Sequence, residues 1–133
     1  MTGDNQHRNS QAEIARAETC LAEAHALHSA GLPYGAVSRA YYAVFHAARA
    51  LVFSIGLEAK GHRAVVSLVG EHFVRTGILP PAIGRVVSRM QRDREDADYE
   101  PAAVFTSDEA AALIVEAERF LAETKRVINA SQS

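Results

Sequence analysis

Two predicted helices of this 133-residue chain carry the side chains best suited to chemistry. At the helical step of 100° per residue, Arg39, His46 and Arg49 share one side of segment 34–55. The rest of that helix is largely apolar, so it is expected inside a bundle or at a subunit interface. Half-buried arginines need anions, either carboxylates of the protein or a phosphate. The stripe predicts either internal ion pairs around a hydrogen-bonded His46 or a phosphate-binding surface.

Arg94 interrupts the apolar stripe of a later predicted helix, segment 81–98. It shares that stripe with four apolar side chains, Ile83, Val87, Met90 and Ala97. An arginine turned toward a core costs several kcal/mol unless it is paired. Arg94 therefore predicts either an ion pair within the protein or a cleft that is open to an anionic ligand.

The charge distribution supports an anionic ligand in the middle of the chain. The whole sequence has a net charge of −2, which excludes a general polycation. The segment from Lys60 to Arg94, however, holds seven Lys or Arg residues against two acids. A basic middle on an acidic protein favours a surface for RNA or a nucleotide.

Several other kinds of site are absent from the sequence. It has no Gly-rich phosphate loop, no His-Glu-x-x-His zinc motif and no Gly-x-Ser-x-Gly nucleophile elbow. His25 and His28 are helix neighbours, but no third metal ligand accompanies them. We expect no metal centre and no cofactor.

Helical periodicity and helix-capping signals predict the elements that must position these side chains. A capping box of Ser10 and Glu13 begins a helix that ends before Gly31. Helices over 34–55, 62–76 and 81–98 follow, and a second capping box, Thr106 with Glu109, begins the last helix, which reaches Ile128. No segment alternates with period two. The sequence predicts an all-α, antiparallel up-and-down bundle of four long helices and one shorter helix.

A chain of this length fits one domain, which we place at residues 10–129, with flexible tails at 1–9 and 130–133. No apolar run approaches the roughly 18–20 residues that span a bilayer, and the first residues are polar. The single cysteine, Cys20, fits a reducing compartment. We expect a cytoplasmic protein that has no membrane contact.

The segment from Arg39 to Arg49, RAYYAVFHAAR, resembles the second-helix signature of HEPN-domain proteins, in their short stand-alone prokaryotic branch. Three further matching segments follow in the same order: Lys60-Gly61-His62, the stretch 73–77, and Arg94-Glu-Asp-Ala-Asp-Tyr99. The resemblance covers roughly residues 10–128. It implies a helical bundle that dimerises, with a cleft between the two protomers.

The resemblance also implies two kinds of activity. Many HEPN proteins are metal-independent ribonucleases, often toxins encoded beside a minimal nucleotidyltransferase antitoxin. Others are non-catalytic modules that bind a nucleotide, RNA or a protein and partner a nucleotidyltransferase. We therefore expect a homodimer that binds RNA or nucleotide phosphate.

The nuclease motif of the family is an arginine followed, four to six residues later, by a histidine. Its arginine falls on Arg94, but Tyr99 stands where the histidine would be. A tyrosine ionises near pH 10 and a histidine near 6.5, so Tyr99 is a poor base, and His46 or His62 would have to replace it. In some relatives a tyrosine just after the motif is adenylylated, and Tyr99 is its nearest equivalent here.

These observations give two sets of expected site residues. The catalytic set is Arg94, His46 and Tyr99. The set expected to hold phosphate or RNA is Arg39, Arg49, His62 and Arg92.

Overall fold

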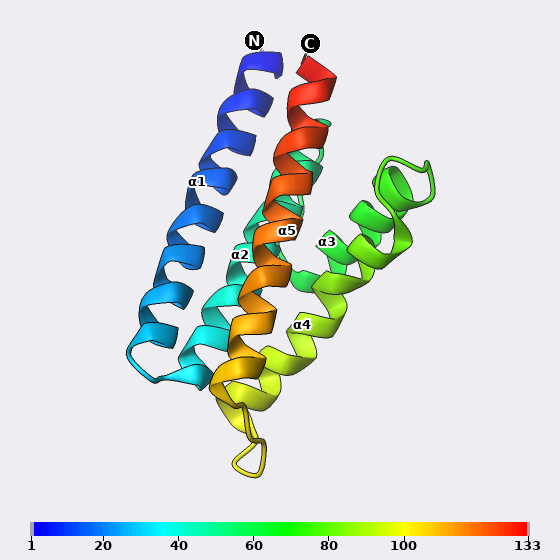
Figure 1. The fold of residues 1–133 in the computed structure, drawn as a ribbon. Helices are drawn as coiled ribbons and strands as arrows, with labels where there is room; N and C mark the ends of the chain where they lie inside the picture. Colours follow the sequence, from blue (N-terminus) through cyan, green and yellow to red (C-terminus); the bar gives the residue numbers. More distant parts are fainter. Residues whose placement is uncertain (1, 133) are drawn as a thin grey trace.

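The computed structural model describes residues 2–132, and it describes the side chains of residues 5–131. Its elements in chain order are α1 (Thr2–Ser29), α2 (Pro33–Ser54), α3 (His62–Val69), the π-helical turn η1 (Gly70–Val74), α4 (Pro81–Tyr99) and α5 (Ser107–Gln132). No strand occurs among these residues. The predicted all-α bundle of four long helices and one shorter helix is confirmed (Figure 1).

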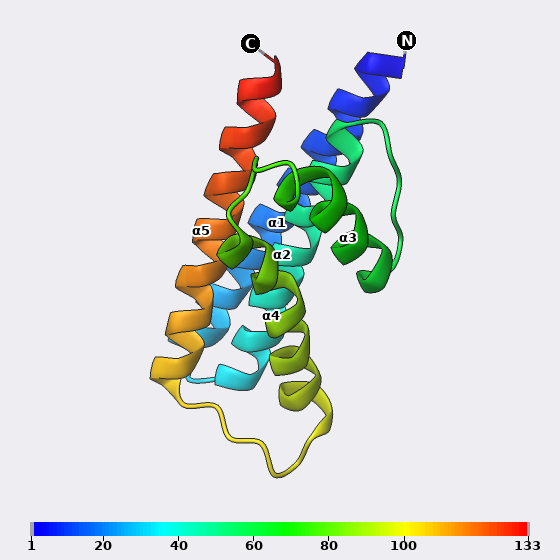
Figure 2. The ribbon, with the colours of Figure 1, turned by 90° about the vertical axis from the view of Figure 1, so that its right-hand side faces the viewer.

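Helix α2 lies at the centre of the bundle and contacts each of the other four α-helices. Helices α1 and α5 run beside it, and the two chain ends lie at the same end of the molecule (Figure 1). Helices α3 and α4 lie together on another side of α2 (Figure 2). Because each of the other four α-helices packs on α2, these contacts decide which way the functional side chains of those helices point.

The core position of α2 follows from its composition. Its buried residues include six alanines as well as Val37, Val44 and Leu51. Burial of each larger aliphatic side chain contributes about 1.5–3 kcal/mol, while alanines allow a neighbouring helix to approach closely. The approach of α1 is close enough for the hydroxyl of Ser10 to donate a hydrogen bond to the carbonyl of Ala50, at 3.0 Å.

The beginning of the first helix differs from the prediction. The capping box at Ser10 is wrong, because α1 is already helical from Thr2 and Ser10 lies buried against α2. Residues 2–9 thus belong to α1. At the other end, α5 continues to Gln132, so residues 130–132 also belong to a helix; residues 1 and 133 lie outside the described part. The spacing of Ser10 and Glu13 is therefore not specific to a helix start. A serine and a glutamate three residues apart also occur inside a helix, where their side chains can bind a neighbouring helix.

Most of the other predicted boundaries agree with the structure. Gly31 and Gly56 end α1 and α2 with positive φ angles of 77° and 82°, a backbone conformation that favours glycine. Helix α5 begins with the predicted capping box: Glu109 N–H donates to Thr106 Oγ1, and Thr106 N–H donates to Glu109 Oε1, both at 3.1 Å. None of the described helices is long and apolar enough to cross a membrane.

The predicted helix 62–76 has a break in its regularity. It is α-helical only to Val69 and then widens into η1, in which the N–H of Arg75 donates to the carbonyl of Gly70. Such π-helical turns are rare and often lie at functional sites.

Candidate functional site

Arg94 lies among three tyrosine rings near the carboxyl end of α4. Its guanidinium carbon is 5.7 Å from the ring centre of Tyr41, 5.8 Å from that of Tyr42 and 5.7 Å from that of Tyr99. Its side chain is only 13% exposed, as expected from its place on the apolar stripe. A cation over aromatic faces is stabilised by about 0.5–1 kcal/mol at exposed sites and by more when it is desolvated. The three tyrosine rings therefore stabilise the positive charge of Arg94, which faces inward because this residue lies on the apolar stripe of α4.

The polar contacts of Arg94 leave part of its hydrogen-bonding capacity unused. Its Nη1 is 3.5 Å from Oδ2 of Asp98, a long contact on the same helix, and Ser38 of α2 donates to that same carboxylate oxygen. Its Nε is buried and has no hydrogen-bond partner among the described residues. Burial pulls the pKa of Arg94 down, but Tyr42, Asp98 and Tyr99 outweigh it and raise the pKa above its usual value. Arg94 is thus a cation whose Nε lacks a partner in the described part of the chain and is shielded from solvent.

His62, the first residue of α3, reaches the same place through Tyr41. Its Nδ1 lies 2.9 Å from the hydroxyl of Tyr41, which is 2% exposed. Burial lowers the pKa of His62, an effect that Glu95 opposes and Arg94 reinforces. Burial also raises the pKa of Tyr41 well above its usual value. A neutral imidazole and a neutral phenol therefore lie beside the cation. We call Arg94, Tyr41, Tyr42, Tyr99 and His62 the Arg94 cluster.

A surface pocket of about 410 Å³ opens beside the Arg94 cluster. Tyr99, 75% exposed, and Arg94 line it together with three carboxylates, those of Glu95, Asp96 and Glu100. An incoming phosphate would meet Arg94 and the hydroxyl of Tyr99, but it would also meet this negative rim. The rim limits how much polyanion one copy of the chain can hold.

His46 and Arg49 belong to a different arrangement, around Glu13 of α1. His46 Nδ1 lies 2.6 Å from Oε2 of Glu13, and Arg49 Nη1 lies 3.1 Å from Oε1 of the same carboxylate. Arg49 also donates from Nε to the carbonyl of Ala59. The side chains of Glu13, His46 and Arg49 are all less than a quarter exposed. For this pair of residues the geometry favours the internal ion-pair interpretation.

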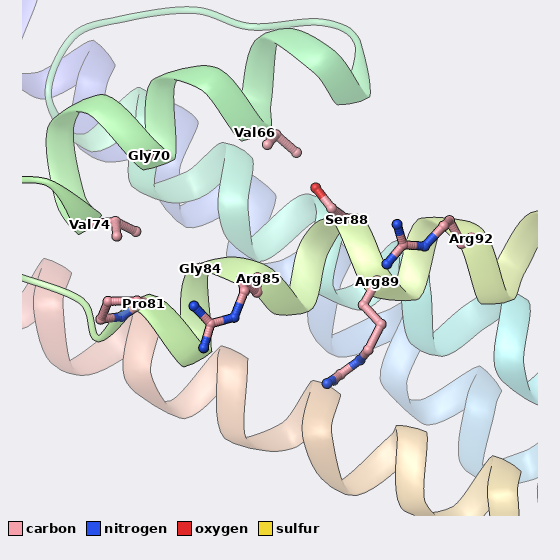
Figure 3. Close-up of a pocket in the computed structure, with 9 residues that line it drawn as sticks. All are labelled: Val66, Gly70, Val74, Pro81, Gly84, Arg85, Ser88, Arg89 and Arg92. Carbon is pink, nitrogen blue, oxygen red and sulfur yellow. The ribbon is translucent and has the colours of Figure 1, made fainter.

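Arg39 lies at the edge of the Arg94 cluster, whereas Arg92 lies outside it. The guanidinium of Arg39 stacks 4.8 Å from the ring centre of Tyr42 and pairs with Glu23 at 3.4 Å. Tyr42 is thus shared between Arg39 and Arg94. Arg92 is exposed on another face of α4, where it lines a separate groove (Figure 3).

The structure therefore brings Arg94, Tyr99 and His62 together, with Arg39 at the edge, and joins His46 and Arg49 to Glu13. Sequence reasoning did not select Tyr41, Tyr42 or Glu13. The two tyrosines are adjacent phenols on a helix that also carries Phe45 and Phe53, and this adjacency is a visible signal. Their common approach to Arg94 depends on how α4 crosses α2, and no local pattern encodes that crossing.

Comparison with known proteins gives three relevant findings. The sequence matches the HEPN domain family over residues 10–127. It is 37% identical over 118 residues to a Methanocaldococcus jannaschii protein named "Putative toxin MJ0605", covering 89% of this chain and 87% of that protein. It is 32% identical over 113 residues to a Thermotoga maritima protein named "UPF0332 protein", covering 85% of this chain and 86% of that one.

A solved structure shares the fold. The crystal structure of TT1696 from Thermus thermophilus superposes with a TM-score of 0.76, covering 90% of this chain and 98% of that one. The two sequences are 19% identical. This likeness shows the arrangement of the helices and nothing about chemistry.

Proposed function

Because the chain belongs to the HEPN domain family, we propose that it binds RNA or nucleotide phosphate at the Arg94 cluster and acts as a toxin-like, metal-independent ribonuclease. The observation that carries the proposal is the state of Arg94. A guanidinium enclosed by three rings, with a buried Nε that has no partner among the described residues, is oriented before any ligand arrives. Fixed donors aimed at developing charge are the main source of electrostatic catalysis.

The reaction needs few groups. The 2′-hydroxyl of RNA attacks the adjacent phosphorus, a base takes its proton, and the 5′-oxygen leaves with a proton from the conjugate acid. The products are a 2′,3′-cyclic phosphate and a free 5′-hydroxyl. Arg94 would bind a non-bridging phosphate oxygen as charge builds.

His62 is the histidine of the Arg94 cluster and the candidate base. Its lowered pKa keeps the imidazole neutral near pH 7, as a base requires. If Nδ1–H donates to the oxygen of Tyr41, Nε2 keeps a lone pair that can accept the proton of the 2′-hydroxyl. Tyr41 then acts as a positioning residue.

The negative rim of the pocket at Tyr99 argues for a cleft between two copies of the chain. Glu95, Asp96 and Glu100 would repel RNA from a single protomer. A second copy that brings cations to this face would compensate for them. We therefore propose a homodimer with the Arg94 cluster facing the shared cleft, in a toxin–antitoxin system with a minimal nucleotidyltransferase.

A second candidate function is a non-catalytic module that binds a nucleotide or RNA and partners a nucleotidyltransferase. It is favoured by Tyr99, which stands in place of the motif histidine. The exposure of Tyr99 makes its hydroxyl accessible to adenylylation by such a partner. In this case Arg94 would hold phosphate without turnover.

Cleavage of RNA in excess EDTA, with analysis of the product ends, separates the two candidates. Under the first, the wild-type chain yields 2′,3′-cyclic ends and Arg94→Gln loses the activity, whereas Arg92→Gln, the control on another face of α4, keeps it. His62→Gln loses activity and His46→Gln keeps it. Binding that Arg94→Gln weakens, without any cleavage by the wild-type protein, supports the second candidate. Cleavage that survives in Arg94→Gln removes Arg94 from the mechanism.

A further inference from the structure

A groove of about 510 Å³ separates α3 and η1 from α4, on a face of α4 other than the one that carries Arg94. Val66 and Val74 point into it from one side, and Ser88 of α4 points back toward them (Figure 3). Arg85 and Arg92 lie along the α4 edge of the groove. The groove therefore combines an aliphatic wall with a cationic edge.

Two glycines shape this groove. A Cβ on Gly84 would lie 2.6 Å from Cγ2 of Val74, so glycine allows η1 to approach α4 closely at this end. Gly70 lies on the opposite side, and a Cβ there would meet no atom within 4 Å. From Pro81 to Arg92 the groove follows α4 for about 16 Å, which is the length of three helical turns.

Only part of the positive charge along the groove is compensated. Arg89 also lines it, but its Nη2 binds Oε2 of Glu116 at 2.5 Å. Arg85 and Arg92 are exposed and form no ion pair with a described residue, although Asp93 lies close enough to Arg92 for the two charges to interact. Two available guanidinium groups thus lie seven residues apart, or about 10.5 Å along α4.

We propose that this groove docks an acidic amphipathic helix of a partner protein. Two carboxylates placed two turns apart on that helix would pair with Arg85 and Arg92, and an aliphatic side chain between them would pack on Val66 and Val74. A helix laid in a groove is a recurrent mode of recognition, read through side chains one or two turns apart. Charge complementarity would set its direction and register.

The lining favours a protein over a nucleic acid. Single-stranded RNA gains much of its affinity by stacking bases on aromatic rings, and no aromatic residue lines this groove among the described residues. Two available cations would also neutralise few phosphates. The inference does not depend on the function proposed for the Arg94 cluster.

A fluorescent peptide tests the proposal. The probe is an amphipathic helix of about 15 residues with two glutamates seven positions apart beside a leucine stripe, and anisotropy measures its binding to the full chain. Arg85→Glu/Arg92→Glu should weaken binding at least tenfold. Gly70→Phe should do the same, because Gly70 lines the groove, has an ordinary helical backbone and has open space around the position of a Cβ. Arg119→Glu, an exposed control on α5, should leave it unchanged.

The remaining outcomes overturn the proposal. They are no binding of the peptide by the wild-type chain, binding that survives in both groove variants, or an oligouridylate that occupies the groove in place of the peptide. If the double arginine variant does not fold, Gly70→Phe decides alone. RNA cleavage by Gly70→Phe should stay at the wild-type level, so failure here is distinguishable from failure at the Arg94 cluster.

Discussion

The hydroxyl of Tyr41 lies 2.9 Å from Nδ1 of His62, so the central helix α2 fixes the imidazole at the start of α3. The same tyrosine ring lies 5.7 Å from the guanidinium carbon of Arg94 on α4. One buried side chain therefore links three helices at the candidate site. Its hydroxyl and its ring have separate roles, which substitutions can separate.

Tyr41→Phe removes the hydroxyl and keeps the ring. We expect a loss of stability of about 1 kcal/mol, typical of one hydrogen bond, and a fall in RNA cleavage because the ring of His62 is no longer oriented. Urea unfolding and the cleavage rate measure the two effects. Tyr42→Phe is the matched control, since the hydroxyl of Tyr42 has no hydrogen bond among the described residues and its ring still faces Arg94. Equal losses in both variants would contradict this role for Tyr41.

Stability should depend on pH through His62. Burial lowers the pKa of His62 in the folded protein below its unfolded value of about 6.5, so the unfolded chain binds the proton first as the pH falls. This contribution is complete above the unfolded pKa and is lost as the pH falls toward the folded pKa. The Tm of the wild-type protein should therefore drop more between about pH 7.5 and pH 5 than that of His62→Gln. Parallel curves for the two proteins would refute the prediction.

Glu13→Ala should destabilise the bundle by about 2 kcal/mol, because it leaves the half-buried Arg49 and His46 without their common carboxylate. Glu23→Ala is the control. Its pair with Arg39 is more exposed, and such pairs contribute less than about 1 kcal/mol. Denaturant unfolding of both variants gives the comparison, and a larger loss for Glu23→Ala would show that the Glu13 pairs are not structural.

Thr106→Ala should destabilise the protein by about 1 kcal/mol, because Thr106 Oγ1 accepts the N–H of Glu109 at the start of α5. Thr19→Ala is the control, since the hydroxyl of Thr19 only donates to a carbonyl within α1. Thermal unfolding measures both. A Tm unchanged in Thr106→Ala would mean that the cap contributes nothing.

Local signals predicted most of the fold. The stops at Gly31 and Gly56, the start of α4 at Pro81 and the cap at Thr106 depend on the conformations of single residues and their nearest neighbours. The capping box predicted at Ser10 failed because its two polar side chains bind residues of α2 that lie more than 30 positions further along the chain. The three-residue spacing of a serine and a glutamate does not show whether the pair caps the start of a helix or binds a neighbouring helix.

The sequence by itself determined the helices, their apolar faces and the inward direction of Arg94, since these follow from helical periodicity. Only the tertiary structure decided which groups meet the buried charges. It joined Glu13 to His46 and Arg49, and it surrounded Arg94 with Tyr41, Tyr42 and Tyr99. The physical reason is that partners on different helices are set by how those helices cross and rotate, which depends on packing over the whole core.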